Sequence, residues 1–154
     1  MKEKVEEIMT RKVITVKEND TVLNVANVLK ENRIAGAPVV NDHGAVVGVV
    51  SVSDILKLLD DCHWYTPFFT AMDILHLHSE ELQDIKQDIE RVSEMKVKDA
   101  MSKNPKTIPP DASIDDVAQI MHSTGFNRLP VVDETGNLVG IVARADIIAS
   151  LYEL

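Results

Sequence analysis

Four side chains of this sequence could bind a metal ion: Cys62, His63, His76 and His78. Thiolate sulfur and imidazole nitrogen are good zinc ligands. Their spacing matches no zinc finger, however, and on a helix His76 and His78 would point to different faces. We therefore expect no metal site.

Motifs for other common catalytic sites are also missing from the sequence. It has no phosphate-binding P-loop and no His-Glu-x-x-His zinc motif. A functional site in this chain should therefore bind a ligand rather than transfer protons, and we expect no enzyme and no catalytic residues.

The acidic character of the chain limits its partners. The net charge is −9, which argues against nonspecific binding to nucleic acid, because such binding needs Lys and Arg to neutralise phosphates. No apolar run approaches the roughly 18 residues that span a bilayer. The N-terminus is charged, and Cys62 is the only cysteine, so a disulfide within the chain is impossible. We expect a cytoplasmic protein without membrane contact.

An internal repeat organises the chain. Residues 5–59 read again at 97–151 with a fixed offset of 92 and no gap. The matched positions include Met9 and Met101, Pro38 and Pro130, Gly48 and Gly140, Asp54 and Asp146. A unit of about 55 residues buries a small fraction of its surface, so each copy should need the other. We expect the copies to close about a pseudo-two-fold axis, with a cleft between them.

Each copy reads as a strand, a helix, a hairpin and a second helix. In the first copy, residues 13–16 are a short β-branched run, and Asp20 or Thr21 can cap a helix from Val22. In the second copy, Ser113 and Asp116 have capping-box spacing.

The hairpins are predicted by pairs of apolar runs around glycine-containing turns. Residues 37–40 and 45–50 form the first pair, and residues 129–132 and 138–142 the second. The runs are almost continuously apolar, so helices should cover one face of each sheet and the sister sheet the other. A last helix should begin near residues 53–54 and 145–146.

The segments carry a family resemblance. Six segments together resemble a tandem pair of CBS (cystathionine β-synthase) domains, a Bateman module. They are an initial Val-x-x-x-Met-Thr/Ser, "TVKENDTVLNVANVL", "APVV", "LPVVDETGNLVG", "GVVSVSDIL" and "GIVARADII". The resemblance covers about 110 of 154 residues. It implies an α+β fold of two β-α-β-β-α repeats, residues 1–59 and 93–154, packed through their sheets, with a helical insert at 60–92.

The resemblance also implies a function. Modules of this kind are regulatory sensors that bind adenosine-containing ligands in the clefts between the copies. AMP is the ligand we favour, beside ADP, ATP and S-adenosylmethionine, and no cofactor is obligatory. The alternative is a ligand-free interaction or scaffold module. The regulated protein is unknown from the sequence.

A ribose-binding pattern of the family, Gly-apolar-apolar-Ser/Thr-x-x-Asp, matches Gly48, Ser51 and Asp54. In the second copy, Ala143 stands where the hydroxyl residue belongs, while Asp146 remains. The alternative role of Ser51 and Asp54 is to cap the last helix, and both roles are compatible.

The resemblance assigns the other binding residues to two clefts. Arg128 stands at a phosphate-contacting position, with Arg144 as a second candidate; the matching residue of the first copy is Gly36. The adenine floor would come from Ile34 with Ala35 or from Phe126 with Asn127, and backbone near Ile14 or Lys106 would contact the base. One cleft then holds Ile34, Ala35, Arg128, Arg144 and Asp146. The other holds Ser51, Asp54, Lys106, Phe126 and Asn127. Only the first should strongly favour a phosphate. A solvated surface charge is the alternative for either arginine.

The insert is acidic and aromatic. It contains four of the six aromatic residues, Trp64, Tyr65, Phe68 and Phe69, and eight acidic residues against Lys86 and Arg91. Leu82, Ile85, Ile89 and Val92 form a narrow helical stripe. The stripe can pack on the flank of the module, or the aromatics can anchor a partner. We expect a homodimer.

Overall fold

A computed structural model describes residues 4–60 and 79–152 and shows the predicted α+β fold. The first copy contains η1 (Val5–Glu7), β1 (Val16–Lys17), α1 (Val22–Glu31), β2 (Gly36–Val40), β3 (Val46–Ser51) and α2 (Val52–Asp60). After α4 (Ser79–Glu94), the second copy contains η2 (Val97–Asp99), β4 (Ser102–Lys103), α5 (Ile114–Thr124), β5 (Arg128–Val132), β6 (Leu138–Ala143) and α6 (Arg144–Tyr152).

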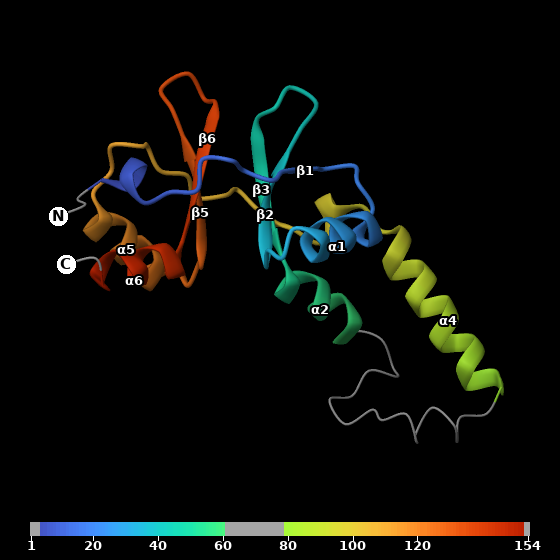
Figure 1. The fold of residues 1–154 in the computed structure, drawn as a ribbon. Helices are drawn as coiled ribbons and strands as arrows, with labels where there is room; N and C mark the ends of the chain where they lie inside the picture. The colour runs from blue at the N-terminus through green and yellow to red at the C-terminus, as the bar shows by residue number, and fades with distance from the viewer. Residues whose placement is uncertain (1–3, 61–78, 153–154) are drawn as a thin grey trace.

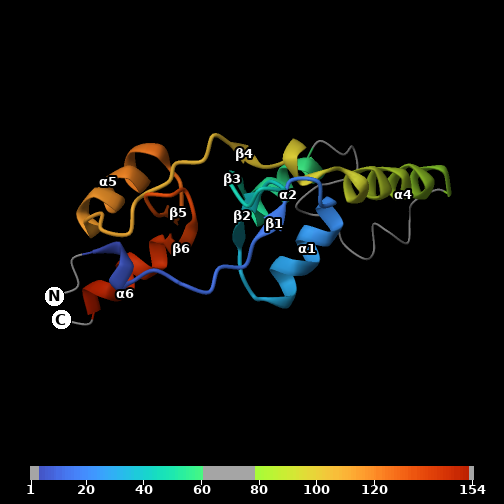
Figure 2. The same ribbon diagram turned by 90° about the horizontal axis from the view of Figure 1, so that it is seen from above.

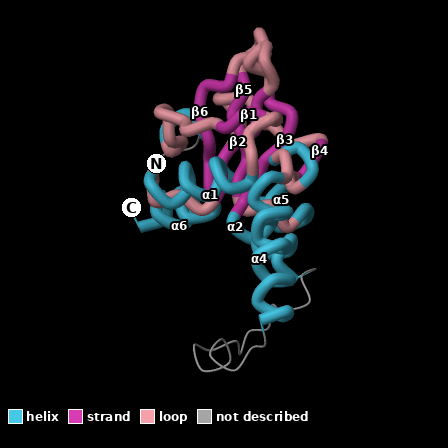
Figure 3. The backbone as a smooth tube through the Cα atoms, turned by 90° about the vertical axis from the view of Figure 1, so that its right-hand side faces the viewer, coloured by secondary structure: helices cyan, strands magenta, loops and turns pink. Residues whose placement is uncertain are grey.

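The strands form two sheets built on the two predicted hairpins. One sheet has the order β1-β2-β3-β4, with β1 parallel to β2 and the other pairs antiparallel. The other is the hairpin β5-β6, extended by single bridges from Ile108 to Val131 and from Thr10 to Ile141. The sheets lie side by side in the middle of the molecule, and α1, α2, α5 and α6 lie outside them (Figures 1 and 2). This confirms the predicted layers. Both hairpin turns point to one end and the helices gather toward the other (Figure 3).

The two copies exchange their first segments. Val5 is fully buried in the core of the second copy, beside Val117 and Leu129. Val97 is fully buried in the core of the first, beside Val25. The folding units therefore differ from the sequence repeats. Each copy needs the other because one wall of its core comes from the other copy.

The exchanged segments lie against two glycines that have no room for a side chain. A Cβ atom at Gly48 would lie 2.5 Å from the Met101 sulfur and 2.8 Å from the Ser102 carbonyl oxygen. A Cβ atom at Gly140 would collide with the Met9 side chain alone. The repeated Met and Gly of the sequence are thus one packing contact, used twice.

The predicted helix starts are confirmed. The Thr21 hydroxyl accepts from the Asn24 N–H at 3.2 Å, and the Ser113 hydroxyl accepts from the Asp116 N–H at 3.0 Å. The strand predicted at residues 13–16 is wrong in position, because β1 is Val16–Lys17. Thr10 is bridged to the second sheet, so the next residues must cross to the first before they can pair with β2.

The insert is described only from Ser79 onward. Helix α4 extends away from the two sheets (Figure 1), and Val92 is buried against Val22 while Ile89 is exposed. The predicted aromatic anchors, Trp64, Tyr65, Phe68 and Phe69, lie outside the described residues, as do Cys62, His63, His76 and His78. Within residues 4–60 and 79–152, no helix combines the length and the apolar character needed to cross a membrane.

The glycine contacts generate a stability prediction. Gly140→Ala should lower the free energy of unfolding by about 1–3 kcal/mol, because the added methyl group overpacks the site. Met9→Ala makes room, so the double variant should be more stable than the sum of the single effects predicts. Gly48→Ala with Met101→Ala should be rescued less, because the Ser102 carbonyl stays in place. Urea unfolding of each double-mutant cycle measures this, and strict additivity in the Gly140 cycle would contradict it.

Candidate functional site

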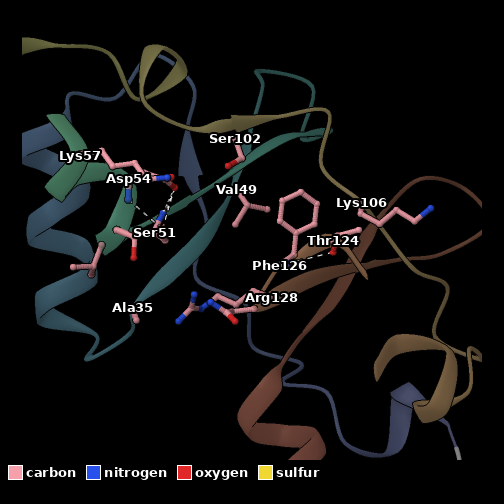
Figure 4. Close-up of a pocket in the computed structure, with 14 residues that line it drawn as sticks. Ala35, Val49, Ser51, Asp54, Lys57, Ser102, Lys106, Thr124, Phe126 and Arg128 are labelled. Carbon is pink, nitrogen blue, oxygen red and sulfur yellow. Dashed lines mark hydrogen bonds between the residues drawn. The ribbon is translucent and has the colours of Figure 1, made fainter. Parts of the chain in front are cut away.

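Two cavities lie between the copies, and each is lined by residues of both. The larger, of about 400 Å³, is called the Ser51 cleft (Figure 4). From the first copy it is lined by Ala35, Val49, Ser51, Val52, Ser53, Asp54 and Lys57; from the second by Ser102, Lys106, Thr124, Gly125, Phe126, Asn127 and Arg128.

Asp54 is held at the junction of β3 and α2. Its Oδ2 atom accepts from the Ser51 N–H at 2.8 Å and from the Ser51 hydroxyl at 3.0 Å, while the Asp54 N–H donates to that hydroxyl at 3.3 Å. The capping role is therefore present. These bonds use only Oδ2, and within the described part of the chain nothing donates to Oδ1. The fixed carboxylate thus keeps an oxygen that can accept from a ligand.

The smaller cavity, of about 200 Å³, is called the Asp146 cleft. It is lined by Thr10, Lys12, Val13, Ile14, Ile34, Ala35, Gly36, Arg128, Ile141, Ala143 and Asp146. Asp146 Oδ2 accepts from the Ala143 N–H at 2.7 Å, which repeats the geometry of the first copy without the hydroxyl bond. This cleft is smaller, and its carboxylate has one bond fewer to fix it.

The structure brings the predicted residues together in two groups. The Ser51 cleft is lined by all residues of one predicted group: Ser51, Asp54, Lys106, Phe126 and Asn127. The Asp146 cleft is lined by Ile34, Ala35, Arg128 and Asp146 of the other predicted group, and also by Ile14, which was predicted only as a backbone contact to the base. That these residues contact a ligand remains a prediction.

Arg144 does not join its predicted group. It is the exposed first residue of α6 and lines neither cavity, although its backbone N–H donates to the Asn127 carbonyl oxygen at 2.9 Å. Residues two apart on a helix lie on different faces, so the Arg144 side chain does not follow Asp146 into the cleft.

Arg128 lines both cavities rather than one. The predicted place of Arg128 in the Asp146 cleft agrees with the structure, but the prediction that the Ser51 cleft has no arginine is wrong. The reason is Gly36, the equivalent residue of the first copy: it has no side chain, and so it leaves space for the arginine side chain between the clefts.

Two lysines were missed from the sequence. Lys57 lines the Ser51 cleft, and it follows Asp54 by three residues in α2, a spacing that places both on one helix face. Lys12 lines the Asp146 cleft because the first segment crosses between the sheets, and no local pattern signals this. In a chain of net charge −9, the Ser51 cleft holds Lys57, Lys106 and Arg128 against Asp54. Both clefts therefore favour an anionic ligand.

Metal binding has no support in the described ranges. Among residues 4–60 and 79–152, no three His, Cys, Asp or Glu side chains cluster closely enough to hold a metal ion.

Comparisons with known proteins agree with this architecture. The family model described as the CBS domain matches residues 5–61 and 97–153. An uncharacterized protein of Methanocaldococcus jannaschii is 33% identical over 154 residues, covering 96% of this chain and 90% of that protein. The chloroplastic CBS domain-containing protein CBSX2 of Arabidopsis thaliana is 31% identical over 143 residues, covering 90% of this chain and 58% of that protein.

Two solved structures show the same fold with ligands. The crystal structure of CBSX2 in complex with AMP matches with a TM-score of 0.71 and 26% identity, covering 97% of this chain and 96% of that chain. The CBS domain pair of protein MJ0100, in complex with 5′-methylthioadenosine and S-adenosyl-L-methionine, matches with a TM-score of 0.72 and 25% identity, covering 97% and 95%.

The unequal carboxylates generate a second stability prediction. Ala143→Ser should supply the missing hydroxyl and raise the free energy of unfolding by about 0.5–1.5 kcal/mol through one added hydrogen bond. Ser51→Ala should lower it by a similar amount. Ala145→Ser, at an exposed position two residues along, is the matched control and should change little. Urea unfolding measures all three, and equal effects of the two serine substitutions would show that the bond to Asp146 does not form.

Proposed function

Because the chain belongs to the CBS domain family and carries that domain twice, we propose that it is a regulatory module that binds an adenosine-containing ligand between the copies. The observation that carries the proposal is the Ser51 cleft. There a fixed carboxylate with one uncommitted oxygen shares a cavity with an aromatic ring and three cationic side chains (Figure 4).

Each part of an adenylate has a suitable partner in this cleft. The Oδ1 atom of Asp54 is free to accept from a ribose hydroxyl. Phe126 is 37% exposed although it is a large apolar side chain, so its ring offers a surface for an adenine, with Val49 lining the same cavity. Arg128 can form paired hydrogen bonds with a phosphate.

AMP is the ligand that the charges favour. The Ser51 cleft has three cationic side chains and one carboxylate, and the Asp146 cleft has Lys12 and Arg128 against Asp146. A cationic ligand such as S-adenosylmethionine would meet an excess of like charge in either cleft. The complexes of CBSX2 with AMP and of the MJ0100 pair with S-adenosyl-L-methionine support the ligand class.

The signal would be a population shift. Both copies line each cleft, so a bound ligand stabilises the arrangement of copies in which the two walls fit it. A scaffold function would instead depend on Trp64, Phe68 and Phe69 and would need no nucleotide.

Assembly into a homodimer is a further part of the proposal. Leu56 on α2 and Ile148 on α6 occupy equivalent positions of the repeat, and both are exposed, as is Leu151. Burial of such apolar residues against a second module would remove them from water.

Removal of the carboxylate tests ribose recognition. Asp54→Ala should weaken AMP binding about ten- to a hundred-fold, because a charge-assisted contact worth about 1.5–3 kcal/mol is lost. Asp42→Ala is the matched control, since it removes an exposed carboxylate that lines neither cleft and should leave AMP binding unchanged. Titration calorimetry with AMP measures both, after thermal unfolding has shown that the variants are folded. If Asp54→Ala and Asp146→Ala both bind AMP as the wild type does, the ribose assignment is wrong.

The dimer is tested by sedimentation equilibrium at micromolar concentration. We expect a species of twice the 17.1 kDa chain mass. Leu56→Lys combined with Ile148→Lys should dissociate it, because two charges would be buried without partners. A wild-type protein that sediments only as a 17.1 kDa species would contradict the dimer.

A further inference from the structure

We infer that a single guanidinium, that of Arg128, serves both clefts, so that an anionic ligand bound in one weakens the binding of an anionic ligand in the other. The inference rests on the proposed function and concerns its regulation. Arg128 lines the Ser51 cleft (Figure 4), and it also lines the Asp146 cleft.

The place of Arg128 follows from a break in the repeat. Gly36 and Arg128 are equivalent residues, 92 positions apart, and begin β2 and β5. A Cβ atom at Gly36 would lie 3.1 Å from both Cδ and Nε of Arg128. The arginine therefore passes directly over the glycine. Space at this point between the copies suffices for one long side chain, and the sequence supplies one.

The guanidinium is not held by the protein. Within residues 4–60 and 79–152, it makes no hydrogen bond and no ion pair, and the nearby carboxylates of Asp54 and Asp146 are held by backbone N–H groups instead. Arg128 is half-buried, and the planar guanidinium matches the geometry of a phosphate. It is therefore available to whichever cleft presents a phosphate.

The other cations are not shared. Lys57 and Lys106 line only the Ser51 cleft, and Lys12 lines only the Asp146 cleft. Each cleft thus retains a local positive charge when Arg128 turns to the other. The first phosphate to bind takes the bidentate partner, and the second binds without it. The coupling is reciprocal, so it weakens either cleft by the same factor.

A calorimetric cycle with AMP measures the coupling. Asp146→Ala weakens the Asp146 cleft, so its tighter binding step reports the Ser51 cleft; in Asp54→Ala the tighter step reports the Asp146 cleft. If the clefts were independent, the wild type would bind two AMP molecules with these two affinities. We expect the affinity for the second AMP to be about ten-fold or more lower than the affinity that the same cleft has when the other is empty. Adenosine, which has no phosphate, should bind the two clefts independently.

Arg128→Met is the decisive variant. Both AMP affinities should fall, and the coupling should vanish, because no shared group remains. Lys57→Met is the matched control: it removes a cation from one cleft and should weaken that cleft while the coupling persists. Coupling that survives in Arg128→Met would identify repulsion between the two phosphates as its cause and overturn the inference.

The remaining outcomes separate this inference from the proposed function. Independent binding of two AMP molecules by the wild type would overturn the sharing but leave the proposed function intact. So would a complete lack of AMP binding by Asp54→Ala, since the Asp146 cleft would then be no site. Failure of every form to bind AMP or adenosine would overturn the proposed function, and the sharing with it.

Discussion

Val5 and Val97 are fully buried, and each lies in the hydrophobic core of the copy to which it does not belong by sequence. The chain must therefore cross twice between the two sheets. Lys12, Val13 and Ile14 lie on the first crossing and line the Asp146 cleft, and Lys106 lies on the second and lines the Ser51 cleft. The clefts are thus a consequence of the exchanged cores, and a ligand in either cleft contacts chain that the cores hold in place.

The same exchange ties the candidate site to the packing of the strands. β3 passes Met101 at Gly48 and ends at Ser51, where Asp54 is fixed; β6 passes Met9 at Gly140 and ends at Ala143, where Asp146 is fixed. The carboxylate follows the glycine by six residues in both copies, just after the end of the same strand. Movement of an exchanged segment would shift the strand, and with it the carboxylate, which gives ligand binding a path to the arrangement of the copies.

Local features were predictable from the sequence because they depend on neighbouring residues. The hairpins lie within one residue of their predicted limits, and the Thr21 and Ser113 caps form as their spacing indicates. Lys57 could have been found from its helical spacing to Asp54. The crossing of residues 11–15 could not be found, because it depends on the core that Val5 enters, and no periodicity reports which of two equivalent cores that is. The grouping of the cleft residues came from the family resemblance.

Departures from the repeat are where the two copies acquire different chemistry. A strictly symmetric pair would place two arginines, or two glycines, at the positions of Gly36 and Arg128. Two arginines would crowd each other, because even a Cβ atom added at Gly36 would lie 3.1 Å from the Arg128 side chain, and they would bring like charges together. Two glycines would leave the point between the clefts without charge. One of each gives a single guanidinium that lines both clefts, so a nearly symmetric scaffold carries one arginine for two clefts. The duplication supplies the two clefts, and the substitution at one position makes them interdependent.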